Sequence, residues 1–134
     1  MVDIIKIHPP FVHFAIAFPV FLLITHLYYT LTKREWNGLH ALLTYLSVLA
    51  VIGGTISGII AHEPIHDVLE KIPPFEVHET LGLFLAPIAL VLAVLRFMKK
   101  QKPFTVLLII LVLLLLYQGY LGGSVVYDHL IKLP

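Results

Sequence analysis

Apolar residues gather in four long stretches that are separated by polar segments. The stretches cover about residues 11–31, 39–61, 77–98 and 104–127. Each has roughly the 20 residues that an α-helix needs to cross the hydrocarbon core of a bilayer. A helix satisfies its own backbone hydrogen bonds, as a segment surrounded by lipid must. The pattern therefore predicts an all-α integral membrane protein, a bundle of four transmembrane helices.

The segments between these stretches differ in length and character. Residues 32–38 and 99–103 form short polar connections, whereas residues 62–76 form a longer one in which apolar side chains recur at helical spacing before a pair of prolines. This spacing predicts a short amphipathic helix at the membrane surface over about residues 64–71. We expect residues 1–134 to form a single membrane domain.

Composition agrees with a lipid environment and excludes several classes of function. Of the 134 residues, 59% are hydrophobic and 13% are charged, which is more apolar surface than a soluble domain of this size can bury. The sequence contains no cysteine, so it offers neither disulfides nor thiolate metal sites. A net charge of +1 without a basic stripe excludes a nucleic-acid-binding surface.

Charged residues are sorted between the two sides of the predicted bundle. Six of the nine basic residues lie at the two short connections, namely Lys33, Arg34, Arg96, Lys99, Lys100 and Lys102. Seven of the eight acidic residues lie at the opposite side, namely Asp3, Glu63, Asp67, Glu70, Glu76, Glu79 and Asp128. By the positive-inside rule, we expect a multi-pass protein of the cell (inner) membrane with both termini on the non-cytoplasmic side.

The sequence also contains an internal repeat with a period of 65 residues. A shift of that length, without gaps, gives the matched pairs Pro9–Pro74, His13–His78, Gly54–Gly119 and Gly58–Gly123. Histidine, glycine and proline matches are harder to obtain by chance than leucine matches in a leucine-rich chain. We therefore predict a parallel duplication of a helical hairpin, with a pseudo-twofold axis along the membrane normal.

The repeat suggests a cofactor site, because it makes two histidines symmetry mates. His13 and His78 both fall in the first turns of helices that start at the outer side. Two facing imidazoles in a four-helix bundle can hold a haem iron from both sides, as in b-type cytochromes. The small residues Gly54, Gly58, Gly119 and Gly123 would line the macrocycle. We therefore predict haem b with His13 and His78 as its axial ligands.

Simpler interpretations of the same residues stay open. The glycine pairs have the small-xxx-small spacing that commonly serves close helix packing. A histidine at the membrane interface can also simply bond to a carbonyl or a headgroup. The repeat favours a functional site, since packing alone does not require a histidine at both related positions.

Two further sites are suggested by the other histidines. The segment from His62 to His66 matches the H-E-x-x-H pattern of zinc proteases, but Pro64 starts a helical turn and leaves His62 outside it. A second outer metal site, built from His8, His62 and His129, is the alternative, with zinc or copper as the metal.

Two histidines lie toward the cytoplasmic side and lack histidine mates in the repeat. His26 and His40 align with Val91 and Thr105 after the shift. A second haem held by His26 and His40 would complete a transmembrane electron path. The alternative is a buried histidine bonded to a neighbouring hydroxyl, with His40 at the interface.

The two ends of the chain resemble those of a known family. Residues 8–17 read HPPFVHFAIA and residues 122–129 read GGSVVYDH. These segments resemble the opening and closing motifs of a family of small prokaryotic four-helix membrane proteins of undefined function. The resemblance covers nearly the whole chain and includes His8, His13, His78 and His129, but not the other four histidines. It implies the four-helix fold and no reaction.

Taken together, these observations predict a b-type, cytochrome-like membrane protein that carries electrons rather than catalysing bond-making chemistry. Its redox partner or quinone is not specified by the sequence, and a homodimer is an open possibility. The alternatives are an outer-face metal-binding or transport-associated membrane protein and a structural subunit of a larger membrane complex.

Overall fold

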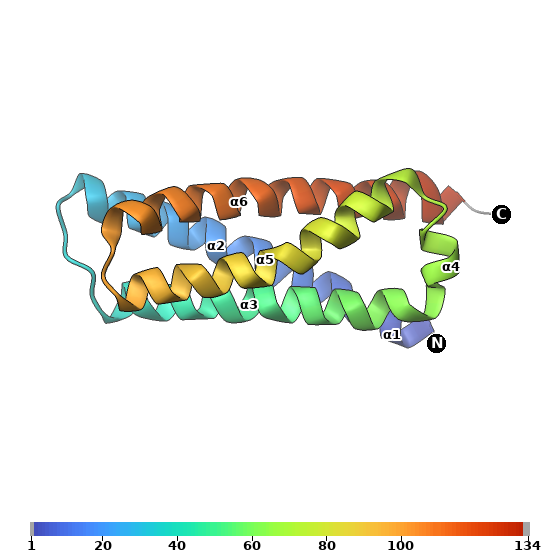
Figure 1. Ribbon diagram of the computed structural model, residues 1–134, viewed down its shortest axis with the longest axis horizontal. Helices are drawn as coiled ribbons and strands as arrows, with labels where there is room; N and C mark the ends of the chain where they lie inside the picture. The colour runs from blue at the N-terminus through green and yellow to red at the C-terminus, as the bar shows by residue number, and fades with distance from the viewer. Residues whose placement is uncertain (1, 133–134) are drawn as a thin grey trace.

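Four long antiparallel helices make up most of the molecule (Figure 1). The computed structural model describes residues 2–132, and the side chains of residues 4–131. The long helices are α2 (His8–Leu31), α3 (Gly38–His62), α5 (Pro73–Phe97) and α6 (Gln101–Gly123). All four are long and apolar enough to cross a membrane. The predicted four-helix membrane fold is therefore confirmed.

Short helical elements occupy one end of the bundle. Helix α1 (Val2–Ile5) precedes α2, and a 3-10 turn (Glu63–Ile65) and α4 (His66–Leu69) stand where the sequence predicts one helix over residues 64–71. The chain after α6 continues as a π-helical segment (Ser124–His129) and a 3-10 turn (Leu130–Lys132). We call this end, which carries both termini, the terminal end. The opposite end, with the two short connections, is the loop end.

Helices α2 and α5 begin several residues before the expected apolar stretches. Each carries proline in its first turn, where a missing amide donor costs nothing and the fixed φ angle suits a helix. Helix α3 begins differently, because the Asn37 side chain accepts a hydrogen bond from the His40 amide at 3.1 Å. Local chemistry thus extends the helices beyond the boundaries that hydrophobicity alone suggests.

The two hairpins share one unusual feature at the loop end. Lys33 and Lys99 have positive φ angles of 54° and 56°, the left-handed conformation in which glycine usually ends a helix. In the residue that follows each lysine, the backbone amide donates back to the helix: Arg34 to the Tyr29 carbonyl, and Lys100 to the Leu95 carbonyl. The helix ends therefore repeat at nearly the spacing of the helix starts, which lie 65 residues apart at residues 8 and 73.

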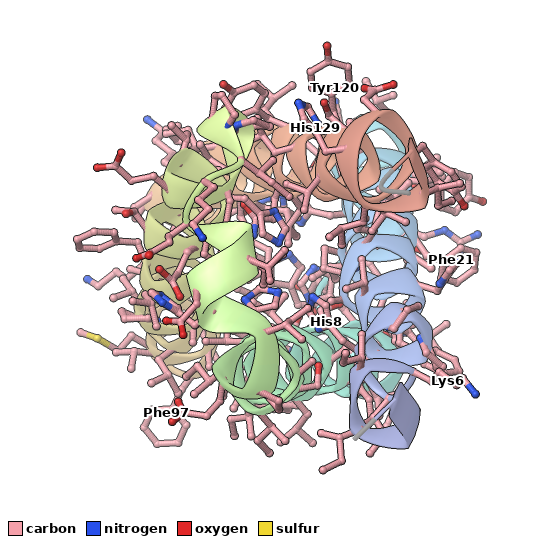
Figure 2. The ribbon with its side chains drawn as sticks, turned by 90° about the vertical axis from the view of Figure 1, so that its right-hand side faces the viewer. Lys6, His8, Phe21, Phe97, Tyr120 and His129 are labelled. Atoms are coloured by element: carbon pink, nitrogen blue, oxygen red, sulfur yellow. The ribbon has the colours of Figure 1, made fainter. Side chains whose placement is uncertain are left out.

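The helices form a four-sided bundle in which each one packs against two neighbours. Helix α2 contacts α3 and α6, and α5 contacts α3 and α6, so the repeat-related pairs are diagonal. The larger of two buried apolar clusters lies in the middle of the bundle and toward the loop end, and it includes the fully buried Leu22, Leu92 and Leu108. Seen from the terminal end, Phe21, Phe97 and Tyr120 project outward, whereas His8 points inward (Figure 2). The outward apolar side chains suit contact with lipid.

Candidate functional site

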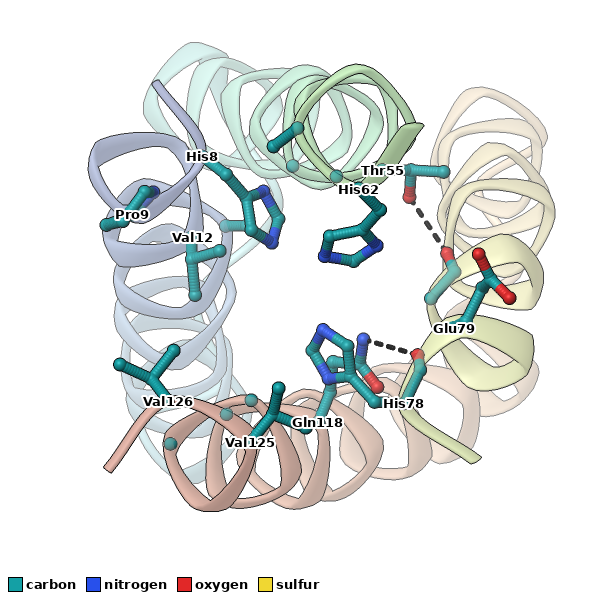
Figure 3. A pocket seen from close by; sticks show the side chains of 18 of the residues that line it. His8, Pro9, Val12, Thr55, His62, His78, Glu79, Gln118, Val125 and Val126 are labelled. Carbon is teal, nitrogen blue, oxygen red and sulfur yellow. Dashed lines mark hydrogen bonds between the residues drawn. The ribbon is translucent and has the colours of Figure 1, made fainter. Parts of the chain in front are cut away.

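Three histidines converge inside the terminal end of the bundle. They are His8, the first residue of α2, His62, the last of α3, and His78, near the start of α5. One nitrogen from each ring lies within 4.8 Å of the others, and Figure 3 shows the three imidazoles facing one another across the interior. We call these three residues the histidine cluster. Ionisable groups at membrane depth are costly and usually mark a functional site.

A serine on α3 fixes the orientation of His8. The Ser57 hydroxyl donates to the Gly54 carbonyl at 3.0 Å, so its oxygen is left to accept from His8 Nδ1 at 2.9 Å. His8 therefore carries its proton on Nδ1, and the lone pair of its Nε2 is available for a ligand. Gly58 makes room for the ring, because a Cβ there would lie 3.1 Å from His8 Cε1.

His78 is the most deeply buried member of the cluster, with 7% of its surface exposed. The ring lies against Gly122, where a Cβ would approach His78 Cε1 to 2.9 Å. Gln118 donates from Nε2 to the His78 carbonyl at 2.8 Å, which ties α6 to this turn of α5. Two buried atoms here, His78 Nδ1 and Gln118 Oε1, have no hydrogen-bond partner among the described residues.

Aromatic contacts hold His62 between its two partners. Its ring centroid lies 5.4 Å from that of His8 and 5.7 Å from that of His78. Phe75 packs edge-on against the His62 ring at 5.1 Å. Because Phe75 is 1% exposed, it forms a fixed wall behind the imidazole, in a small apolar cluster with Leu69 and Val125.

The histidine cluster lines a large cavity. The cavity has a volume of about 930 Å³ and is lined by residues of all four long helices and of the terminal segments. Its deepest residues, Val51, Leu85 and Leu115, are each at most 3% exposed. A volume of this size lies at the upper end of the range for small-molecule sites. The cavity is therefore larger than a metal ion alone requires.

Acidic side chains stand at the rim of the cavity. Glu63 and Glu79 line it together with His66, and Glu79 Oε1 lies 3.7 Å from His66 Nε2. Negative charge at the mouth of a cavity with apolar walls raises the local concentration of cations. The rim thus favours the approach of a positively charged ion to the histidine cluster.

The structure brings together only part of the predicted outer sites. His13 lies at the edge of the cavity, is exposed, and donates from Nδ1 to the Pro9 carbonyl at 2.6 Å. His8 and His13 are five residues apart, so their side chains point about 140° apart around the helix. The inward direction of His8 therefore turns His13 away from the cluster. His129 donates from Nδ1 to the Ser124 carbonyl at 3.1 Å.

The four glycines predicted to line a macrocycle all line the cavity. Two of them also let helices approach closely, since a Cβ at Gly54 would lie 3.0 Å from Ala15 Cβ, and one at Gly119 would lie 2.9 Å from Ile16 Cδ1. Gly58 accommodates His8, as described above. A Cβ at Gly123 would meet no described atom within 4 Å.

The remaining pair of histidines lies at the loop end in a continuous hydrogen-bond chain. Arg96 Nε donates to His40 Nδ1 at 2.9 Å. The other ring nitrogen of His40, Nε2, is hydrogen-bonded to His26 Nδ1 at 3.1 Å. His26 Nε2 is in turn hydrogen-bonded to Thr105 Oγ1 at 2.8 Å. Thr105 in turn donates to the Gln101 carbonyl. Since a guanidinium can only donate, every proton in the chain points from Arg96 toward Thr105.

This loop-end chain uses both ring nitrogens of His26 and of His40. Both histidines are fully buried, and Trp36 stacks on His40 with ring centroids 4.7 Å apart. The arrangement leaves neither imidazole a free nitrogen for an iron atom. The contact of His26 with the Thr105 hydroxyl agrees with the simpler alternative for that residue, whereas His40 is buried and not at the interface.

Sequence reasoning missed how His8 and His62 meet, although a signal for it exists. In an antiparallel hairpin, residues equidistant from the connection face each other. Positions 8 and 62 are equally far from residue 35, and positions 26 and 40 are equally far from residue 33; both central residues lie in the connection between α2 and α3. The roles of Ser57, Gln118 and Gly122 depend on helix rotation and carry no comparable signal.

Comparison with known proteins places the chain in a family. No curated protein matches the sequence, and no solved structure matches it. The sequence pattern of one family, described as predicted membrane protein, matches residues 5–133, which is nearly the whole chain and includes all three residues of the histidine cluster. The chain therefore belongs to the family of predicted membrane proteins DUF2231.

Proposed function

We propose that this membrane protein binds a d-block metal ion, zinc or copper, through His8, His62 and His78. The observation that carries the proposal is the convergence of three imidazole nitrogens within 4.8 Å of one another. Imidazole ligands suit zinc and copper, whereas magnesium and calcium prefer oxygen ligands. Nitrogens that share a tetrahedral zinc ion each lie about 2.0–2.1 Å from it and therefore about 3.4 Å from one another. The imidazoles, whose nitrogens lie within 4.8 Å of one another, would have to close by about 1 Å, which side-chain rotation can supply.

Two features of the surroundings support a metal that reacts or exchanges rather than a closed structural ion. Three protein ligands leave a fourth coordination position, as in catalytic zinc sites, and here that position faces the cavity. The hydrogen bond from His8 to Ser57 supplies the second-shell contact that typically orients a metal-bound histidine. The acidic rim attracts the ion from solution.

A metal-content measurement tests this proposal directly. Protein purified in detergent is loaded with zinc or copper, dialysed, and assayed by elemental analysis. We expect one metal ion per chain, with strong loss in His62→Ala and in His78→Ala. His129→Ala serves as the matched control, because its imidazole bonds within its own segment. Equal metal content in all four proteins would refute the proposal.

Haem b is a second candidate, supported by the volume of the cavity. His78 and His13 both line this cavity of about 930 Å³, and a haem between them would serve electron transfer. Two members of the histidine cluster are a poorer axial pair, because the third ring stands where the macrocycle would lie. A Soret band that sharpens on reduction and disappears in His13→Ala would support haem. Colourless protein after expression with ample haem would exclude it.

We also propose an orientation in the membrane. The basic residues at the loop end and the acidic residues at the terminal end favour a cytoplasmic loop end. The histidine cluster then faces the non-cytoplasmic side. The variant Lys100→Cys carries the only cysteine of the sequence, and its thiol can be treated with a reagent that does not cross the membrane. Labelling in intact cells would contradict the proposed orientation.

A further inference from the structure

The histidine cluster occupies only the part of the cavity nearest the terminal end. The remainder extends along the bundle toward its middle. On α3 the lining residues extend from His62 to Val51, 11 positions earlier in the chain, or about 16 Å along the helix. The deep walls are apolar side chains and glycines, apart from Thr55, whose hydroxyl already donates to the Gly82 carbonyl at 3.0 Å. Water gains little in such a space, since it lacks the two to four polar partners that a buried water needs. The part of the cavity nearer the middle of the bundle therefore suits an apolar chain.

The cavity is also accessible from the lipid. Its lining includes exposed residues on two sides of the bundle, Ala17 on α2 and Ile59 and Leu83 on α3 and α5. In Figure 3, Val12 and Val126 stand on either side of the space between α2 and the π-helical segment. Short π-helical segments of this kind occur frequently at functional sites. A ligand dissolved in the bilayer can thus enter without crossing water.

Polar groups between the apolar part and the histidine cluster define the head of such a ligand. Gln118 Oε1 is a buried acceptor that has no donor among the described residues, and His78 Nδ1 is likewise unpaired. An amide oxygen requires an N–H or O–H donor, so a hydroxyl fits Gln118 whereas a carbonyl does not. When a metal occupies His78 Nε2, its Nδ1 carries a proton and requires an acceptor, which the same hydroxyl oxygen supplies.

The charge at the rim selects among lipid-soluble molecules with a hydroxyl head. Glu63 and Glu79 line the cavity mouth, and their negative charge disfavours fatty acids and anionic phospholipids. A neutral head remains. A flat aromatic diol offers one hydroxyl to Gln118 and a second oxygen toward the open coordination position of the metal.

We propose that the cavity binds a membrane quinol, with its hydroxyl head between Gln118 and the histidine cluster and its apolar tail toward Val51. The contact of the second oxygen with a metal, and the proton on His78 Nδ1, rest on the proposed metal site. The apolar tail, the lateral entry and the Gln118 contact do not.

Direct binding of a defined probe tests the proposal. The probe is a ubiquinol with a decyl tail, kept reduced under anaerobic conditions, and titrated calorimetrically into zinc-loaded protein in detergent. We expect saturable binding at one site per chain. The corresponding quinone lacks the donor for Gln118, and an unpaired buried acceptor should weaken it about tenfold. Equal affinity for the two forms, or tight binding of a plain decyl alcohol, would overturn the assignment of the head.

Two variants locate the bound quinol. Val51→Phe fills the floor of the cavity and should weaken binding at least tenfold. Ile56→Phe is its matched control on the same helix, since Ile56 is 51% exposed and faces lipid, and it should bind as the unaltered protein does. Unchanged quinol binding by Val51→Phe would refute the proposal.

Metal analysis of the same samples separates the two hypotheses. Zinc that binds at one ion per chain without saturable quinol binding would overturn the quinol proposal alone. Unaltered protein that takes up neither zinc nor copper but binds quinol saturably would overturn the metal site and leave the tail and Gln118 contacts supported.

Discussion

The contact between His8 and Ser57 allows a quantitative test of the metal site. Replacement of Ser57 by alanine removes the acceptor of the His8 Nδ1 proton, 2.9 Å away, without touching a proposed ligand. The buried N–H then lacks a partner, which costs about 1–3 kcal/mol, or roughly 5- to 150-fold in affinity. Second-shell substitutions at known metal sites lose about 10- to 100-fold. We therefore expect Ser57→Ala to weaken zinc binding by about 10- to 100-fold.

The assay is a competition titration of zinc against a chromophoric chelator, with the purified protein in detergent. Ser47→Ala is a close control, because Ser47 is also buried on α3 but donates its hydroxyl to the carbonyl of Leu43 in its own helix. It should bind zinc as the unaltered protein does. If Ser57→Ala and Ser47→Ala bind zinc equally well, the assigned orientation of His8 is incorrect.

Gly122→Ala should weaken zinc binding, since its Cβ would lie 2.9 Å from His78 Cε1, whereas Gly123→Ala should not; the chelator titration measures both. Lys99→Gly should raise the free energy of unfolding in detergent by about 0.5–1 kcal/mol, because glycine adopts the positive φ angle of this residue without strain. Arg96→Leu should lower the free energy of unfolding by about 1–3 kcal/mol, because His40 Nδ1 loses its hydrogen-bond donor. The zinc content should stay unchanged. Zinc affinity should fall as the pH is lowered, because protons compete for the imidazole lone pairs, and a pH-independent affinity would exclude histidine ligation.

The helices and their order were predictable from sequence because length and hydrophobicity alone decide whether a segment can span a bilayer. Their starts were less predictable, since the prolines of residues 9–10 and 73–74 extend α2 and α5 beyond the apolar stretches. The surface segment also differs, because a 3-10 turn at Pro64 separates α3 from α4.

The composition of the histidine cluster was not predictable from the repeat. In a soluble protein, an amphipathic pattern identifies the buried face of a helix. Helix α2 is apolar on all sides, so the sequence does not show whether His8 or His13 faces inward. The repeat relates His13 to His78 by position, but the two positions differ in environment, exposed in one helix and buried in the other.

The partnership between His78 and the first hairpin depends on how the two hairpins are rotated against each other. That rotation is set by close contacts such as Gly54 with Ala15 and Gly119 with Ile16, which involve residues far apart in sequence. Equal distance from a connection predicts contacts within one hairpin only. The sequence therefore contains a signal for the contact of His62 with His8, but none for its contact with His78.

The hydrogen-bond chain at the loop end has a consequence for assembly. It passes from Arg96 in the second hairpin to His40 and His26 in the first, and returns to Thr105 in the second. Each hairpin on its own would expose half of these polar groups to hydrocarbon, where they find few partners. These hydrogen bonds therefore favour the association of one hairpin with the other in the membrane. Two hairpins made as separate polypeptides should find each other in the membrane and restore the bundle.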